Sequence, residues 1–175
     1  MECASRAYQM SEHAPRELSG TELLRQEEEN MFKHILLPTD GSQLSEMAIQ
    51  KGIQFAKAIN ARVTGFHVLP EFPEFTYRPE ILEDTKEEFT GDPRARAAQY
   101  LKVIEEAANK AGVRCDTGYT KSAHPYEAII TAAEENGCDL IVMAFHGRRG
   151  VQALLIGSET HKVLAYTNIP VLVYR

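Results

Sequence analysis

Apolar residues along the chain gather in short continuous runs and in longer stretches with a helical period, and the two kinds alternate. The runs predict buried strands at 34–37, 62–69, 113–120, 140–144 and 170–174. The stretches between them place apolar residues on one side of a helix, at 42–59, 93–111, 124–136 and 158–166. The pattern therefore predicts a strictly alternating order of strands and helices.

Strands joined by helices of this length are parallel, so the predicted fold is α/β, an open five-stranded parallel sheet with helices on both faces. The run at 113–120 is more polar than the others, which favours a position near the sheet edge. The run at 140–144 has no polar alternation and is expected to be buried on both faces. In such folds ligands bind beyond the carboxyl ends of the strands, where the strand order reverses.

Two segments fall outside this pattern. Residues 1–30 carry seven Asp/Glu against three Lys/Arg and no strand-like run, which predicts a disordered extension or a short helix over 17–30. A domain is expected from Met31 to the last residue, and Met31 could itself be the start codon. Residues 70–92 contain three prolines and many carboxylates, which predicts a loop with a turn of helix near Ile81.

Composition narrows the function classes. Hydrophobic residues make up 43% and charged residues 25%, the balance of a soluble globular domain. The net charge of −6 argues against nucleic-acid binding through a basic face. Cys3, Cys115 and Cys138 are widely spaced, which fits unpaired thiols in a reducing cytoplasm, the last two buried and inert. No apolar run reaches the length of roughly 18 residues typical of a membrane span, so no membrane partner is expected.

Candidate chemistry follows three predicted element boundaries. Pro38-Thr39-Asp40-Gly41-Ser42 comes directly after the first strand, although such residues are also ordinary in turns. The strand at 140–144 leads into a loop that holds Gly147, Gly150, Arg148 and Arg149. Gly157-Ser158 opens a helix, whose free N–H groups and dipole suit a phosphate, and Ser158 could cap this helix or bond a phosphate oxygen. Together they predict an anion site at one edge of the sheet.

These segments, from Pro38 to Ser42, from His146 to Gly150, and Gly157-Ser158, resemble the universal stress protein family, and the resemblance spans residues 31–175. The ATP-binding branch of that family has a Gly-x2-Gly-x9-Gly-Ser/Thr loop, in which Gly147 is the second glycine here. The first glycine is replaced by Ala144, and the large Phe145 follows it. The family fold is Rossmann-like, of the adenine nucleotide α-hydrolase-like kind.

The resemblance implies that the chain binds ATP, with Mg²⁺ or Mn²⁺ bridging the phosphates, and forms a homodimer through its C-terminal strand. Asp40 is expected near the adenosine end and Val68 at the adenine. The residues implied to bind the nucleotide are Pro38, Thr39, Asp40, Val68, Met143, Ala144, Gly147, Arg148, Gly157, Ser158, Glu159 and Thr160. The expected role is a nucleotide-responsive stress or regulatory protein and not an enzyme, with ATPase or autophosphorylation activity slow at most.

Two other functions stay open at the level of sequence. One is an interaction module of the same fold that binds no nucleotide. Whether the chain binds a nucleotide or not depends on Ala144 and Phe145, where it departs from the family motif. The other is an ATP pyrophosphatase-like enzyme, but that kind carries an SGGxDS-type loop where this chain has Pro38 to Ser42. Glu159 could face a phosphate-bound metal ion. His67 is expected to be a satisfied core or interface histidine, and His146 is expected to hold its loop by hydrogen bonds.

Overall fold

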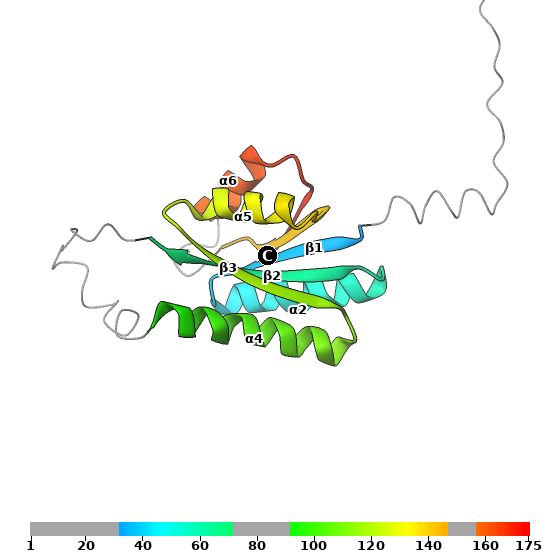
Figure 1. Cartoon of the computed structure of the whole chain (residues 1–175). Helices are drawn as coiled ribbons and strands as arrows, with labels where there is room; N and C mark the ends of the chain where they lie inside the picture. The colour runs from blue at the N-terminus through cyan, green and yellow to red at the C-terminus, as the bar shows by residue number, and fades with distance from the viewer. Residues whose placement is uncertain (1–31, 72–91, 147–156) are drawn as a thin grey trace, which may run out of the picture. The chain divides into compact units, whose positions relative to one another are not determined.

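The computed structural model describes residues 32–71, 92–146 and 157–175, all within the unit Phe32–Arg175. Figure 1 shows that these residues build one sheet with helices above and below it. The strands are β1 (His34–Thr39), β2 (Arg62–Pro70), β3 (Cys115–Ser122), β4 (Leu140–Ala144) and β5 (Val171–Tyr174). They pair in the order β3-β2-β1-β4-β5, and every pairing is parallel. The predicted five-stranded parallel sheet is confirmed, with the polar strand β3 at an edge.

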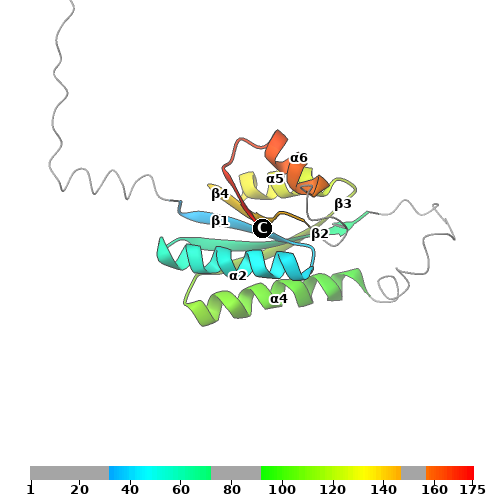
Figure 2. The same cartoon turned by 180° about the vertical axis from the view of Figure 1, so that it is seen from behind.

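Two helices cover each face of the sheet, as Figures 1 and 2 show from opposite sides. On one face, α2 (Gln43–Ala58) and α4 (Pro93–Ala111) bury Ile53 and Ile104 against the strands. On the other face, α5 (Pro125–Glu135) and α6 (Ser158–Tyr166) bury Ile129 and Val163. The apolar faces that predicted these helices are therefore the two layers of the core. None of the helices in the described ranges combines the length and apolar character that crossing a membrane requires.

Several element boundaries differ from the sequence prediction by one or two residues. β1 continues to Thr39 because Pro38 still pairs with Phe66 in register, although it lacks an N–H group. β3 begins later than predicted because Val113 donates its N–H to Ala108 at the end of α4. Gly157 and not Ser158 is the N-cap of α6, so of the two roles that the sequence left open for Ser158 the structure excludes the cap.

The order of the strands in the sheet determines where a ligand-binding crevice is expected. After β1 the chain moves outward through β2 and β3, then crosses back to β4 on the other side of β1. The neighbouring carboxyl ends of β1 and β4 are thus the switch point, where ligands bind in sheets of this type. Predictions for residues 1–30, for the turn near Ile81 and for Gly147 to Gly150 lie outside the described residues.

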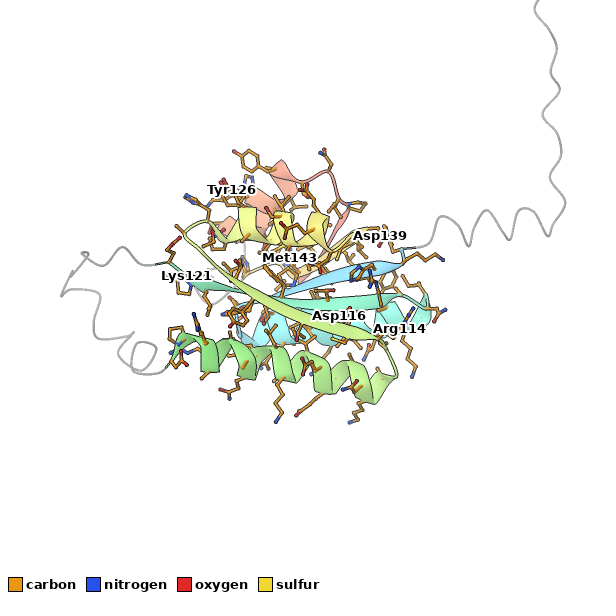
Figure 3. All side chains as sticks on the ribbon, viewed as in Figure 1. Arg114, Asp116, Lys121, Tyr126, Asp139 and Met143 are labelled. Carbon is orange, nitrogen blue, oxygen red and sulfur yellow. The ribbon has the colours of Figure 1, made fainter. Side chains whose placement is uncertain are left out.

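The opposite, amino-terminal edge of the sheet is closed by Asp139. Its carboxylate accepts the N–H groups of Lys33 at 2.7 Å and His34 at 3.0 Å, joining the start of β1 to the turn before β4. Figure 3 places Asp139, Arg114 and Asp116 toward this edge, and Lys121 and Tyr126 at the other end. The buried ring of His34 shares a hydrogen bond of 2.7 Å with the hydroxyl of Thr64.

His34 makes the fold sensitive to mild acid. Burial, followed by the nearby positive charge of Arg62, lowers the pKa of His34 below its ordinary value of 6.5. The unfolded chain therefore takes up a proton before the folded one does, and stability falls with pH below about 6.5, by at most about 1.4 kcal/mol per pH unit. In urea titrations at a series of pH values, His34→Gln should lose less stability on acidification than the wild type. The exposed His161→Gln should follow the wild type, whereas identical slopes for all three proteins would contradict this role of His34.

Candidate functional site

A cavity of about 610 Å³ opens at the carboxyl edge of the sheet, over the ends of β1 and β4. Ten of the twelve residues implied by the family resemblance line it, and the other two, Gly147 and Arg148, lie outside the described residues. The ten are Pro38, Thr39, Asp40, Val68, Met143, Ala144, Gly157, Ser158, Glu159 and Thr160. The fold thus brings together segments that are more than a hundred residues apart in the sequence.

The loop after β1 forms one wall, and its own hydrogen bonds fix it. The hydroxyl of Thr39 accepts the N–H of Gly41 at 3.0 Å and lies 3.1 Å from the hydroxyl of Ser45. The carboxylate of Asp40 accepts the N–H of Ser42 at 3.0 Å, as in an Asx turn. Ser42 caps α2, since its hydroxyl accepts the N–H of Ser45 at 3.2 Å.

Gly41 is required in this loop for two independent reasons. Its φ of +73° lies in the left-handed region, which disfavours side chains. A Cβ at this position would also lie 2.4 Å from the ring of Tyr100, which belongs to α4. Tyr100 therefore braces the loop from outside, a contact that no motif in the sequence indicates.

The floor of the cavity is largely apolar and contains one buried imidazole. Phe66, Met143 and Ile129 contribute apolar surface from the sheet and from α5. The Nδ1 atom of His67 lies 2.7 Å from the carbonyl oxygen of Thr39, so Nδ1 carries the hydrogen. The same ring meets Tyr100 edge-on with centroids 5.3 Å apart. The expectation of a satisfied buried histidine is confirmed, and His67 also lines the cavity, which the sequence did not indicate.

The other wall joins the end of β4 to the start of α6. The carbonyl of Phe145 accepts the N–H of Gly157 at 2.7 Å, and the hydroxyl of Thr160 donates to the carbonyl of Ala144 at 2.9 Å. The N–H of Phe145 in turn donates to the carbonyl of Tyr174 at 2.7 Å. These bonds hold the first turn of α6 beside the switch point.

The first three N–H groups of α6, from Ser158, Glu159 and Thr160, point outward at a helix start that no side chain caps. Within the described part of the chain the structure gives these donors no partner. Unpaired N–H groups and the positive end of the helix dipole attract anions. All three residues line the cavity, so this wall is suited to phosphate oxygens.

The carboxylate of Glu159 bonds one group of the neighbouring helix α5 and one group of its own helix α6. Its Oε2 atom accepts the N–H of Tyr126 at 2.9 Å, in the first turn of α5, where the N-cap His124 makes no side-chain bond. Its Oε1 atom accepts a hydrogen bond from Nζ of Lys162 at 2.9 Å. Glu159 thus caps α5 instead of α6, and sequence spacing could not show this because the two helices meet only in the fold. No group of three or more metal-ligating side chains occurs among the residues described.

Ala144 and Phe145, which depart from the family motif, do not force the backbone into an unusual conformation. Asn60 is the one non-glycine residue with positive φ in the described ranges, so Ala144 occupies an ordinary strand conformation. The ring of Phe145 does not line the cavity but packs against His146 and Arg175. His146 does line it, and its buried Nε2 has no hydrogen-bond partner in the part of the chain described, so the expected loop-holding bond is not found there.

The two described cysteines take no part in the site. Cys138 is buried and Cys115 is half-buried, and both are free thiols. Burial raises the pKa of each to about 11, so both stay protonated at neutral pH. The expectation that they are inert is in accord with this environment.

Comparison with known proteins supplies independent evidence. The model of the universal stress protein family matches residues 31–175. Universal stress protein MJ0531 of Methanocaldococcus jannaschii is 32% identical over 147 residues, covering 84% of each chain. Universal stress protein YxiE of Bacillus subtilis is 32% identical over 149 residues, which cover 83% of this chain and all of the relative.

Several solved structures share the fold of this chain. The structure of MJ0577 from Methanocaldococcus jannaschii is 30% identical, with a TM-score of 0.62 over 82% of this chain and 95% of that one. A universal stress protein in complex with cAMP shares the fold at 24% identity, with a TM-score of 0.61 over 82% of this chain and 97% of that one. A family protein of Arabidopsis thaliana with AMP bound does so at 14% identity, with a TM-score of 0.57 over 81% and 90%. The chain belongs to the universal stress protein family.

Proposed function

We propose that this chain is a regulatory stress protein of the cytoplasm that binds an adenine nucleotide, ATP above all, in the cavity at the carboxyl edge of its sheet. The observation that carries the proposal is the pairing of two unlike surfaces in one cavity, a polar wall and an apolar floor. One wall offers the N–H groups of Ser158, Glu159 and Thr160, which have no partner among the described residues, and the floor offers apolar surface from Phe66 and Met143. An adenine nucleotide has two matching parts, an anionic phosphate chain and a flat base with apolar faces.

In this proposal the phosphates bind at the start of α6 and the adenosine lies toward the ends of β1 and β2. Asp40 lies near the adenosine end and Val68 contacts the adenine, while Gly147 and Arg148 complete the phosphate loop. Mg²⁺ or Mn²⁺ takes its ligands mainly from phosphate oxygens and water, as hard cations do. The volume of about 610 Å³ lies within the range of small-molecule sites. That two proteins of this fold hold cAMP and AMP supports the choice of an adenine nucleotide.

A binding role fits the site better than rapid hydrolysis. Phosphoryl transfer to water needs a group that positions the attacking water near the γ-phosphate. The carboxylate of Asp40 is engaged by the N–H of Ser42, and that of Glu159 is engaged by Tyr126 and Lys162. Any ATPase or autophosphorylation activity is therefore expected to be slow, and the nucleotide acts by changing what the protein contacts.

Calorimetric titration of the full chain with adenosine, AMP, ADP and ATP, each with and without Mg²⁺, tests the proposal. Saturable binding of the adenine nucleotides with one site per chain is expected, and GTP should bind more weakly. Absence of binding by every one of these ligands at millimolar concentration would contradict the proposal. That result would favour the interaction module that binds no nucleotide.

We further propose that two copies pair through β5. This strand lies at the end of the sheet, and its Leu172 is 46% exposed. An apolar edge strand of this kind gains by covering its free side with another strand. Light scattering at micromolar concentration should give the mass of a dimer for the wild type and of a monomer for Leu172→Glu. Leu164→Glu, which changes a similarly exposed leucine on α6, should remain dimeric, and a monomeric wild type would rule out this assembly.

A further inference from the structure

Glu159 lines the cavity at the start of α6, and its carboxylate is held there from two sides. The N–H of Tyr126 in α5 and the ammonium of Lys162 in α6 each bond one of its oxygens, both at 2.9 Å. Lys162 is further fixed by the ring of Tyr126, whose centroid lies 5.1 Å from Nζ. Figure 3 shows Tyr126 at the end of the molecule where α5 and α6 come together. These contacts hold the carboxylate beside the first turn of α6.

The polar and charged groups at this end of the site therefore act on a bound anion in opposite directions. The backbone N–H groups of Ser158, Glu159 and Thr160 favour an anion. The side chain of Glu159 disfavours one, and the ammonium of Lys162 offsets part of that repulsion. The side chains of Glu159 and Lys162 are 34% and 44% exposed, so solvent weakens the offset without removing the carboxylate from the cavity wall.

We propose that the Glu159–Lys162 pair sets the charge preference of the site, so that the divalent-cation complex of a polyphosphate nucleotide binds better than the free anion. This inference rests on the proposed nucleotide site. The penalty from Glu159 grows with the negative charge on the ligand: it is absent for adenosine, small for AMP and largest for ATP without a metal ion. A bound Mg²⁺ cancels part of the ligand charge and with it part of the penalty.

The test compares dissociation constants for adenosine, AMP and ATP, with Mg²⁺ or with EDTA, across two site variants and two controls. Glu159→Gln keeps an oxygen that can accept the N–H of Tyr126, so the cap of α5 is retained. It should tighten binding of metal-free ATP by roughly threefold to tenfold, the scale of one partly exposed charge acting on a multiply charged ligand. Lys162→Met should weaken the same binding by a similar factor. Adenosine binding should stay unchanged in both, and the effects should shrink at high salt.

Glu106→Gln and Lys102→Met are matched controls, because these residues form an exposed pair at 3.6 Å on α4, outside the cavity lining. Neither control should alter any of the dissociation constants. If the wild type binds ATP and Glu159→Gln binds it with the same affinity and the same response to Mg²⁺, the inference is overturned while the nucleotide site stands. Equal changes for adenosine and ATP would overturn it too, because they indicate a structural role. If the wild type binds no nucleotide, the proposed function itself fails.

Discussion

Replacing Ile104 by alanine is expected to lower the free energy of unfolding by about 2–5 kcal/mol, the usual cost of truncating a buried isoleucine. Ile104 is 0% exposed and lies between α4 and the sheet, in the cluster that also holds Ile53 and Leu37. Its neighbour Val103 is 42% exposed on the same helix. Val103→Ala should therefore change the free energy of unfolding by less than about 0.5 kcal/mol. Urea denaturation of the two variants measures the difference directly.

Gly65 of β2 faces Ile104 and allows a second test of the same packing. A Cβ on Gly65 would lie 2.8 Å from Cδ1 and 3.0 Å from Cγ2 of Ile104. Gly65→Ala therefore overpacks the wild-type core and should lower the free energy of unfolding by about 1–3 kcal/mol. Ile104→Ala removes both of those atoms. The double variant should consequently be more stable than the sum of the single effects predicts, by about 0.5 kcal/mol or more. Strict additivity would show that α4 does not pack on β2 as the structure has it.

Replacing Ser158 by proline is expected to weaken ATP binding by roughly tenfold or more without unfolding the protein, because it deletes one N–H donor to a charged phosphate. Ser158 is the first residue of α6, the position where proline is well accepted in a helix. The preceding Gly157 has φ −57° and ψ 144°, the extended conformation that a residue before proline prefers. The backbone thus already has the shape that the substitution needs.

Ser158→Ala separates the two donors of this residue, since it removes the hydroxyl and keeps the N–H group. A smaller loss of ATP affinity is expected for alanine than for proline, and the affinity for adenosine should fall less than about threefold in either variant. Thermal denaturation serves as the check on folding. Unchanged ATP affinity in a folded Ser158→Pro protein would show that the start of α6 does not bind the phosphates.

The fold was predictable from the sequence because its signals are local. The apolar run of β4, the buried face of α4 and the caps at Ser42 and Gly112 each specify an element without reference to the rest of the chain. The predicted boundaries differed where local signals compete. The proline at position 38 suggested an end to β1, but sheet pairing continued through it.

The candidate site was predictable only in its outline. Asp40, which follows a strand end, and Gly157, which precedes a helix, could be assigned to one edge because parallel strands all end there and the connecting helices begin there. Contacts between distant elements could not be predicted. The ring of Tyr100 packs against the loop at Gly41, and the carboxylate of Glu159 accepts the N–H of Tyr126. Both contacts join elements whose relative position no sequence spacing encodes. Such contacts decide the geometry and the charge of the site.

Amide chemical shifts of the labelled full chain, recorded during titration with ATP and Mg²⁺, will show whether an adenine nucleotide binds at the carboxyl edge of the sheet. We expect saturable shifts for Thr39, Val68, Ala144 and Ser158, all of which line the cavity. Arg114 and Asp139, at the amino-terminal edge, should not move. Shifts confined to that edge or to the surface around Tyr119, or no shifts at millimolar ATP, would contradict binding of the nucleotide at the carboxyl edge.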